Sequence, residues 1–119
     1  MTRRYVPDSG DIVWLNFDPQ SGREQAGYRP AVVLSSASYN GKTGMLVCCP
    51  MTTRVKGYPF EVSIAGTRPG AVLSDQFKSF DWRARKATYK GRVTASELTE
   101  IRRKLGVLIG LAPMTSVQS

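Results

Sequence analysis

The 119-residue chain contains no histidine. Histidine is the commonest general base near neutral pH and the usual nitrogen ligand of zinc, so neither role can fall to an imidazole here. The motifs G-x-x-x-x-G-K-[ST] and G-x-G-x-x-G are also missing, and the nine acidic residues are scattered rather than paired. These absences argue against a nucleotide cofactor and against a hydrolase built on two carboxylates. The sequence therefore predicts no metal and no cofactor.

Cysteine is scarce, and the two residues present, Cys48 and Cys49, are adjacent. Neighbours in a strand point to opposite faces, so we expect neither a disulfide nor a metal site from this pair. Two small buried thiols are typical of a reducing compartment. No apolar run follows the N-terminal arginines or is long enough to span a bilayer. The sequence predicts a cytoplasmic protein without a signal peptide or a membrane span.

Positive charge is abundant. The chain has 17 Lys and Arg against 9 Asp and Glu, which gives a net charge of +8, while 41% of residues are hydrophobic and 22% are charged. Such a composition is that of an ordinary globular domain. The basic surplus predicts a polyanionic partner, most simply a nucleic acid. The alternative is a solvated basic face with no such partner.

Short apolar segments between turn signals predict a mainly β fold. The expected strands cover residues 11–17, 29–35, 44–52, 58–64 and 86–93, with turns on both sides of 71–74 and an Asn40-Gly41 turn before the third strand. Several short strands closed by one helix suggest a small, strongly curved sheet or barrel. Because such a fold has many exposed edges, dimerisation is expected.

One segment, near the C-terminus, has helical period. Thr94 and Glu97 stand at capping-box spacing, so the helix should begin near Ala95. Its apolar positions step by three, four and three residues, at Leu98, Ile101, Leu105 and Leu108. We expect a single domain over residues 1–111, followed by a mobile polar tail over 112–119.

A segment rich in both cations and aromatics lies between Lys78 and Arg92. Its cations are Lys78, Arg83, Arg85, Lys86, Lys90 and Arg92, set against the single acid Asp81 and interleaved with Phe80, Trp82 and Tyr89. Bases stack on aromatic rings and phosphates pair with cations, so this mixture suits single-stranded RNA. The alternative is that the aromatics belong to the core, which we expect at least of Trp82, and that the cations are solvated.

The loop "SGREQAGYRP", residues 21–30, places an acid and a base between two apolar strands. With the segments around it, "GDIVWLNFDPQSGREQAGYRPAVVLS", "YNGKTGMLVCCPMTTRVKGYPFEV" and "DQFKSFDWRARKA", it resembles the MazF/PemK family of toxin endoribonucleases of type II toxin–antitoxin systems. The resemblance covers about residues 4–110, and several motifs occur in register and in order. Tyr28 departs from it, since some relatives have a histidine there, as does Arg23, where a serine is common.

The resemblance implies an SH3-like barrel of the plasmid-maintenance toxin type, a homodimer, and sequence-specific cleavage of single-stranded RNA without a metal. It also implies inhibition by a cognate antitoxin with an acidic, disordered tail. Carried over by position, the catalytic residues are Glu24, Arg29 and Thr52. The residues expected to contact RNA are Trp14, Phe17, Arg23, Gln25, Arg54, Lys56, Lys78 and Arg85.

The chemistry of RNA agrees with these assignments. Cleavage without a metal needs the 2′-OH deprotonated, the phosphorane charge stabilised and the 5′-oxygen protonated. Glu24 can accept the 2′-OH proton, Arg29 can donate to the phosphate oxygens, and the Thr52 hydroxyl can add a donor. The products would be a 2′,3′-cyclic phosphate and a 5′-hydroxyl. The group that protonates the 5′-oxygen stays open between Arg29 and water.

Two other functions remain open at this point. The chain could be a non-catalytic, basic SH3-like module that only binds nucleic acid or protein, or a gyrase-poison toxin, because gyrase poisons share this barrel. A surface acid and base on a flexible loop would suit either. The Glu24–Arg29 loop favours the nuclease, since a module that only binds a polyanion has no need of the acid.

Overall fold

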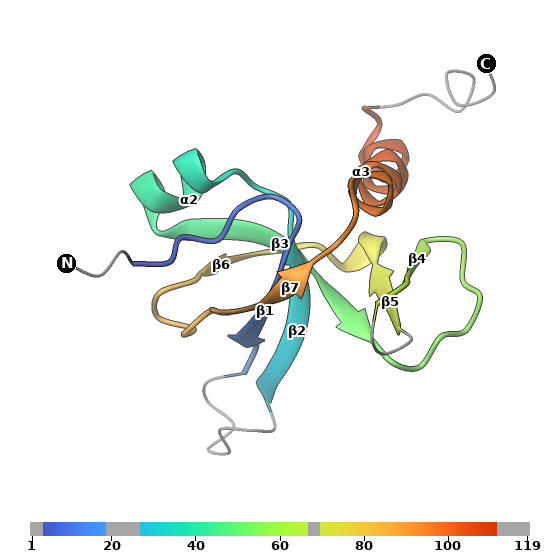
Figure 1. Cartoon of the computed structure of the whole chain (residues 1–119). Coiled ribbons are helices and arrows are strands. Elements are labelled where there is room, and N and C mark those ends of the chain that lie inside the picture. Colours follow the sequence, from blue (N-terminus) through green and yellow to red (C-terminus); the bar gives the residue numbers. More distant parts are fainter. Residues whose placement is uncertain (1–3, 19–26, 67–69, 112–119) are drawn as a thin grey trace.

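Seven strands form one strongly curved antiparallel sheet in the computed structural model, which describes residues 4–18, 27–66 and 70–111 (Figure 1). The strands are β1 (Asp11–Asn16), β2 (Tyr28–Val33), β3 (Met45–Thr52), β4 (Glu61–Ile64), β5 (Gly70–Leu73), β6 (Lys78–Asp81) and β7 (Thr88–Arg92). The helices are α2 (Ala37–Thr43), α3 (Ala95–Ile109) and the 3₁₀ helix η1 (Ser74–Gln76). The mainly β fold with a C-terminal helix is confirmed.

Strand β3 joins the two parts of the sheet. Its first half pairs with β6, from Met45 to Cys48, whereas its end pairs with β5 at Met51 and Thr52. Its other edge pairs with β2, and the order continues through β1 to β7. Because β6 and β7 are joined by only residues 82–87, the two ends of the path β6-β3-β2-β1-β7 are drawn together. The sheet therefore curls into a half-barrel.

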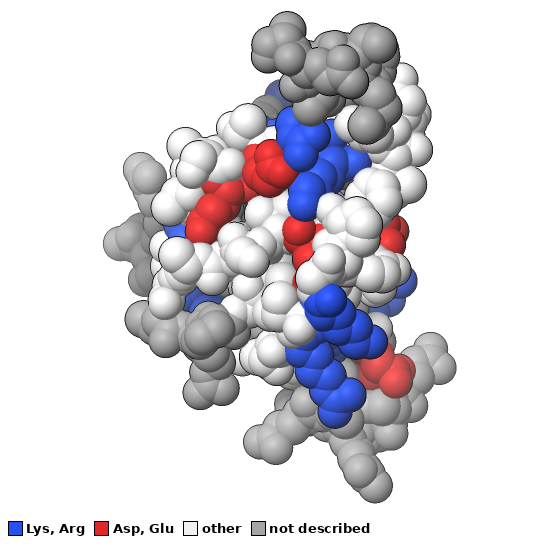
Figure 2. Space-filling model, turned by 90° about the vertical axis from the view of Figure 1, so that its right-hand side faces the viewer, with Lys and Arg blue, Asp and Glu red and all other residues white. Residues whose placement is uncertain are grey.

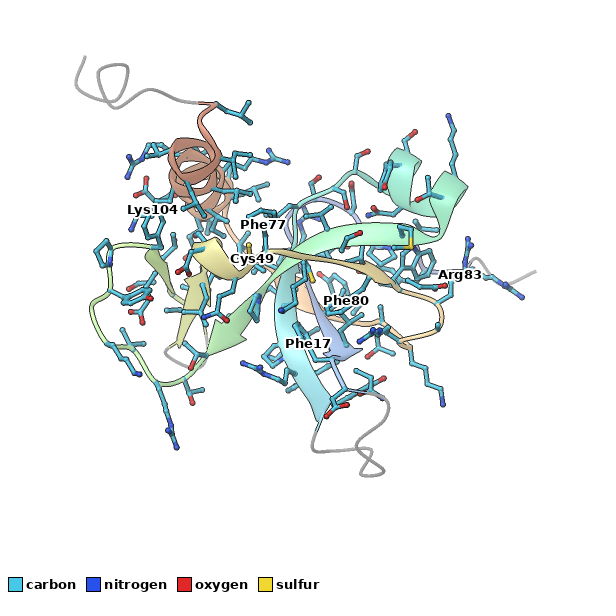
Figure 3. The ribbon with its side chains drawn as sticks, turned by 180° about the vertical axis from the view of Figure 1, so that it is seen from behind. Phe17, Cys49, Phe77, Phe80, Arg83 and Lys104 are labelled. Atoms are coloured by element: carbon cyan, nitrogen blue, oxygen red, sulfur yellow. The ribbon has the colours of Figure 1, made fainter. Side chains whose placement is uncertain are left out.

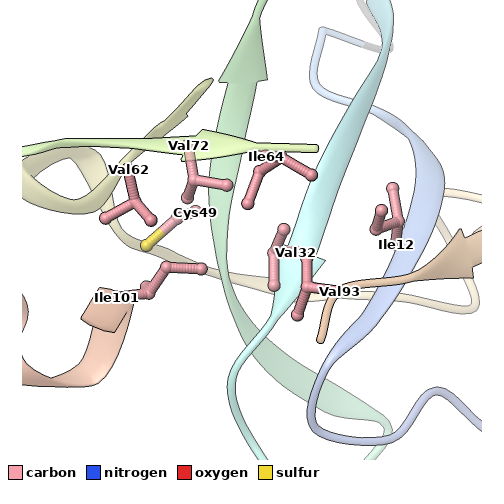
Figure 4. Packing of buried hydrophobic residues seen from close by; sticks show 8 residues of the cluster. All are labelled: Ile12, Val32, Cys49, Val62, Ile64, Val72, Val93 and Ile101. Atoms are coloured by element: carbon pink, nitrogen blue, oxygen red, sulfur yellow. The ribbon is translucent and has the colours of Figure 1, made fainter. Parts of the chain in front are cut away.

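The two faces of this sheet carry separate hydrophobic clusters, as the alternation of side chains along β1 requires. Val13 and Leu15 lie in the cluster enclosed by the half-barrel, with Ala31, Val33, Leu46, Cys48 and Trp82. Ile12 lies in the other cluster, where Ile101 of α3 packs against the sheet (Figure 4). The second cluster is completed by Val32, Cys49, Val62, Ile64, Val72 and Val93.

The adjacent thiols fall on opposite faces, as predicted. Cys48 belongs to the cluster inside the half-barrel and Cys49 to the cluster under α3, and both are free and buried. Burial raises the pKa of each thiol to about 12, so both stay protonated at neutral pH. Trp82 is buried as well, which confirms the expectation that it is a core residue.

The C-terminal helix begins where its capping signal predicts. The Thr94 hydroxyl accepts the Glu97 N–H and the Glu97 carboxylate accepts the Thr94 N–H, and Gly110 ends the helix at a φ of 85°. Ile101 is fully buried, but Leu108 is 44% exposed, so only the first part of the apolar stripe contacts the sheet. Among the described residues, no helix is long and apolar enough to cross a membrane.

Residues 37–43 form helix α2, so the prediction of an Asn40-Gly41 turn was wrong. The Ser36 hydroxyl accepts the Tyr39 N–H at its start, and Gly44 ends it at a φ of 75°. A helix of seven residues is too short to show an apolar period, and only Asn40 of this one is buried. The capping residues were its only signal.

Strand β6 and helix η1 were also missed. β6 reads Lys-Ser-Phe-Asp, and three of these four side chains are exposed, so it has no apolar alternation. It forms because its backbone pairs with the first half of β3. The predicted tail, residues 112–119, lies outside the described residues.

Asn40 links three segments that are far apart in the sequence. Its side-chain amide donates to the Pro7 carbonyl at 2.8 Å and to the Ser35 carbonyl at 3.1 Å, and its oxygen accepts the Ser35 hydroxyl at 2.6 Å. Its own carbonyl accepts the Trp82 indole N–H at 2.9 Å. A fully buried amide with every polar atom paired fixes the N-terminal segment and the β6–β7 connection against α2.

Replacing Asn40 by alanine should therefore lower the free energy of unfolding by about 2–4 kcal/mol, because two interior carbonyls lose their donor. Urea denaturation measures the change. Lys42→Ala, at an exposed position of the same helix, is the control and should change stability by less than about 0.5 kcal/mol. Equal stability of the two variants would show that the Asn40 bonds do not hold these segments together.

Candidate functional site

The strands fix both ends of the predicted catalytic loop. The Phe17 N–H donates to the Gly27 carbonyl at 2.7 Å, so the chain leaving β1 is joined to the chain entering β2. A Cβ at Gly27 would lie 2.5 Å from the Asn16 Oδ1 atom, so this close approach needs glycine. Three of the predicted site residues, Arg23, Glu24 and Gln25, lie outside the described residues.

Arg29 lies at one end of a stack in which two aromatic rings stand between two arginines, at the mouth of the half-barrel. Its guanidinium lies 5.4 Å from the centre of the Phe17 ring. Phe17 packs edge-on against Phe80, with ring centres 5.0 Å apart, and the guanidinium of Arg85 lies 4.2 Å from the Phe80 ring. Figure 3 shows Phe17 and Phe80 close together beside the sheet. We call these four side chains the Arg29–Arg85 stack.

Arg85 also holds the end of β1 in place. One of its terminal nitrogens donates to the Asn16 carbonyl at 3.2 Å and to the Phe17 carbonyl at 2.9 Å. In return, the Asn16 N–H donates to the Arg85 carbonyl at 3.1 Å. Part of the Arg85 guanidinium is thus committed to the backbone where the catalytic loop begins. Its predicted contact with RNA would have to use the remaining donors.

Tyr28 performs a structural task that the sequence did not reveal. Its hydroxyl donates to the Lys86 carbonyl at 2.6 Å, which ties the start of β2 to the turn between β6 and β7. Lys86 has a φ of 56°, a left-handed conformation that a side chain disfavours, so the turn needs such support. The residue that precedes Arg29 therefore holds the turn between β6 and β7 in place.

The register of β2 and β3 extends toward Arg29 and Thr52. The two strands pair Val33 with Cys48 and Ala31 with Pro50, and the same register continued by two residues would set Arg29 opposite Thr52. Residues opposite one another in antiparallel strands share a face, so the two side chains project on the same side. The Thr52 hydroxyl accepts the Arg54 N–H at 3.0 Å. A hydroxyl also carries a proton, so Thr52 can still donate to a ligand.

A shallow pocket of about 190 Å³ begins at Thr52. It brings together three of the predicted site residues, Thr52, Arg54 and Lys56, and the cations of the latter two are exposed. The rest of its wall is formed by Tyr58, Glu61, Leu73 and Gln76. None of these four was predicted. They come from the β3–β4 connection, from β4 and β5 and from η1, and no local pattern shows that these segments meet.

Lys78 stands on the same face. It pairs with Cys48 in the register of β3 and β6, two positions before Pro50 and four before Thr52. Its side chain is exposed. The strand register therefore places Lys78 on the same face of the β3–β6 region as Thr52, which lines the pocket, and its continuation along β2 adds Arg29 to that face.

Trp14 does not join this group. It lies on the opposite face of β1 from Leu15 and pairs with Pro30 of β2. Its side chain is 37% exposed, and the Lys90 ammonium lies 5.5 Å from the centre of its ring.

Arg83 is also remote from the site, at the end of the molecule away from Lys104 in Figure 3. It stacks on Trp82 at 4.7 Å and donates to the Gly41 carbonyl at 3.3 Å.

Cations gather on the surface in separate groups. Figure 2 shows two such groups on one face of the molecule, with acidic side chains beside the upper one. Within residues 4–18, 27–66 and 70–111, no group of three His, Cys, Asp or Glu side chains is placed to hold a metal ion. The chemistry available at the described site is therefore that of hydrogen-bond donors and positive charge, both suited to an anion.

A curved antiparallel β half-barrel with a C-terminal helix and a basic pocket that begins at a threonine is typical of the plasmid-maintenance toxin class. Residues 8–109 match the family described as PemK-like, MazF-like toxin of type II toxin-antitoxin system. The chain belongs to this family, which confirms the resemblance found in its sequence.

Individual relatives agree with this assignment. The chain is 60% identical over 111 residues to the endoribonuclease toxin MazF of Escherichia coli K12, covering 92% of this chain and all of the relative. It is 30% identical to the endoribonuclease PemK of Escherichia coli, covering 92% and 90% of the two chains. The chain is thus a homologue of the endoribonuclease MazF.

Solved structures show the same fold. The chain superposes on MazF in a MazE–MazF crystal structure from Deinococcus radiodurans with a TM-score of 0.81 and 48% identity, covering 92% of this chain and 100% of the other. A crystal structure of MazF alone from the same organism gives a TM-score of 0.81 with 53% identity, covering 90% and 99%. The half-barrel is therefore the MazF-like fold.

Proposed function

We propose that this protein is a sequence-specific, metal-independent endoribonuclease that cleaves single-stranded RNA, and that residues 1–111 form its catalytic domain. The observation that carries the proposal is the basic pocket lined by Thr52, Arg54 and Lys56, together with the β2–β3 register, whose continuation would set Arg29 opposite Thr52. The name of the 60%-identical relative, endoribonuclease toxin MazF, supports the same reaction. The proposed substrate is mRNA in the cytoplasm.

Arg29 is the proposed anion clamp. Its guanidinium is exposed at the edge of the sheet and rests over the Phe17 ring, so its orientation is restricted by the stack. A planar guanidinium donates two parallel hydrogen bonds to a phosphate, and an ammonium cannot reproduce that geometry. Thr52 offers a hydroxyl donor from the neighbouring strand. Together they stabilise the negative charge that develops on the phosphorane oxygens.

Glu24 is the proposed general base. It precedes Gly27 by three residues, and consecutive Cα atoms are about 3.8 Å apart, so its Cα is tethered within about 11 Å of the Gly27 Cα, just before β2. The Glu24 carboxylate removes the 2′-OH proton, the 2′-oxygen attacks the adjacent phosphorus, and the bond from phosphorus to the 5′-oxygen breaks. Protonation of the 5′-oxygen, by Arg29 or water, leaves a 2′,3′-cyclic phosphate and a 5′-hydroxyl.

RNA would be bound by the surface around this centre. Arg54, Lys56 and Lys78 are exposed cations on or beside the pocket, and Phe17 and Phe80 offer aromatic edges at the mouth of the half-barrel. Phosphate pairing supplies affinity on such a surface, and stacking holds the bases of a single strand. Arg23 and Gln25 would contact the bases next to the cleaved bond.

The reaction predicts cleavage in the absence of metals. Purified protein in excess EDTA should cut a mixed-sequence single-stranded RNA at a limited set of sites and leave 2′,3′-cyclic phosphate and 5′-hydroxyl ends, because the 2′-oxygen is the nucleophile. Denaturing gels and end-specific labelling measure both results. The same RNA carrying 2′-O-methyl groups should be bound but not cut. Activity lost in EDTA and restored by Mg²⁺, or binding without cleavage of any RNA, would refute the proposal.

The two charged residues should differ in importance. Arg29→Ala should lower kcat by at least about a thousandfold, since it removes transition-state charge stabilisation. Glu24→Ala should cost about a hundred- to ten-thousandfold, the usual value of a general base. Arg102→Ala, which removes an exposed arginine from α3, is the control and should leave kcat unchanged. Cleavage by Glu24→Ala at the wild-type rate would remove Glu24 from the mechanism.

We further propose that the protein is a homodimer and is inhibited by an antitoxin with an acidic, disordered tail. The crystal structures of MazF with MazE from Deinococcus radiodurans support a protein inhibitor. Two protomers, each with a charge of +8, would strongly attract an acidic segment. A tail lying over Arg54, Lys56 and Lys78 would block RNA from reaching Arg29, without any change in the site itself.

This model of inhibition predicts competition. The acidic tail of a MazE antitoxin should displace labelled 2′-O-methyl RNA from the protein, and both affinities should fall as salt concentration rises. Fluorescence anisotropy measures the displacement, and analytical ultracentrifugation measures the mass of the assembly. A ternary complex in which RNA and tail bind together, each at its separate affinity, would contradict a shared surface. A monomeric mass would contradict the homodimer.

A further inference from the structure

Glu61 is an acid buried within the basic pocket. It is the first residue of β4, only 9% of its surface is exposed, and it lines the pocket with Arg54 and Lys56. A carboxylate loses free energy when it leaves water, unless polar groups replace the lost hydration. Among the described residues no salt bridge involves Glu61, so its charge is balanced by other donors.

Those donors are backbone N–H groups of the loop between β3 and β4. The Lys56 N–H lies 3.1 and 3.2 Å from the two carboxylate oxygens of Glu61, and the Gly57 N–H donates at 3.0 Å. Gly57 has a φ of 76°, so the chain turns sharply there. The carboxylate thus acts as an internal cap that holds this turn of the loop.

Glu61 is itself fixed from behind by helix α3. The Lys104 ammonium donates to the Glu61 carbonyl at 2.8 Å, and Figure 3 shows Lys104 on the helix. At the other end of β4, the Ala65 N–H donates to the Glu97 carboxylate at 2.9 Å. Lys104 thus fixes the end of β4 that presents the Glu61 carboxylate to the loop, whereas Glu97 contacts the chain only beyond the far end of β4.

The loop has little else to order it. Every residue from 53 to 59 is exposed, so this segment buries little apolar surface. Among the described contacts, its backbone is held by the Glu61 carboxylate, by the Thr52 hydroxyl at Arg54, and by the carbonyl of Tyr58, which accepts the Glu61 N–H at 3.0 Å. A segment of this kind samples other conformations when its hydrogen bonds are removed.

We infer that Glu61 is a positioning residue for RNA recognition: its carboxylate touches no RNA, but it holds the 53–59 loop so that the side chains of Arg54 and Lys56 face the pocket beside Thr52. This inference rests on the proposed RNA-cleaving function. A loop that occupies its binding-competent conformation only part of the time weakens affinity by that fraction. Chemistry at Arg29 and Thr52 would be affected much less, since both residues lie in strands and the Glu61 carboxylate is bonded to the loop instead.

Electrostatics alone predicts that loss of the Glu61 charge strengthens RNA binding, so the experiment separates the two explanations. Replacing a glutamate by glutamine adds one unit of positive charge to the protein and should strengthen its attraction for RNA. If Glu61 acts by holding the loop, Glu61→Gln should weaken binding instead. The glutamine keeps the shape of the side chain, but it replaces one acceptor oxygen by an NH₂ group that cannot accept from the loop.

The experiment compares Glu61→Gln with Glu97→Gln in the full-length protein. Both variants change the charge of the protein equally. Glu97 also accepts backbone N–H groups, from Thr94 and Ala65, but it does not contact the loop.

For Glu61→Gln, Kd for 2′-O-methyl RNA should rise about tenfold, if the loop occupies its binding-competent conformation about a tenth of the time. KM should rise likewise and kcat should change by less than about threefold, because transition-state contacts remain. Amide exchange at Lys56 and Gly57 should accelerate at least about tenfold.

The control variant should lower stability, but it should leave Kd and the exchange of those two amides within about twofold of wild type. Unchanged amide exchange in Glu61→Gln, unchanged or tighter RNA binding, or an equal loss of affinity in Glu97→Gln would each overturn the inference. Glu61→Ala provides a second comparison and should weaken binding at least as much. Failure of the wild-type protein to cleave RNA would refute the nuclease, whereas the Kd and exchange comparison would still decide the role of Glu61.

Discussion

The pairing of β2 with β3 determines where every other part of the site can lie. Its register is fixed from Val33 and Cys48 to Ala31 and Pro50, and its continuation would bring Arg29 and Thr52 to the same face. A shift by one residue would turn Arg29 to the other side of the sheet and would expose the buried side chains that follow it in β2. The apolar cluster inside the half-barrel therefore protects the geometry of the site, although none of its buried aliphatic members needs to touch a ligand.

Many of the cations that give the chain its charge hold the fold together. Arg92 forms an ion pair of 2.5 Å with the buried Asp11, Arg85 donates to the end of β1, and Arg83 donates to α2. Net charge predicts an anionic partner, but it does not distinguish the cations that bind the backbone from those that face solvent. Only geometry separates Lys56 and Lys78 from such structural arginines.

The parts of the structure that were predicted depend on local signals. The capping box at Thr94 and the adjacent thiols are patterns of a few residues, and both had the expected consequence. The parts that were missed depend on contacts between distant segments. Tyr28 reaches the turn at Lys86, 58 residues away, and Asn40 reaches Trp82, 42 residues away, so no local pattern reveals either. The pocket shows the same division. Motifs pointed to Thr52, but they did not reveal the distant residues that complete the pocket wall.

The scarcity of groups that titrate near neutral pH has a further consequence. The chain has no histidine, and the pKa of both thiols is raised to about 12 by burial. Burial and the hydrogen bond to Asp11 raise the pKa of Tyr5 as well. Histidine and cysteine, the side chains whose ordinary pKa values lie closest to neutrality, therefore add no change of charge between about pH 6 and 9. The electric field that attracts a polyanion is thus nearly constant while the acidity of the surroundings varies, and a pH dependence of turnover would report on the reacting groups themselves.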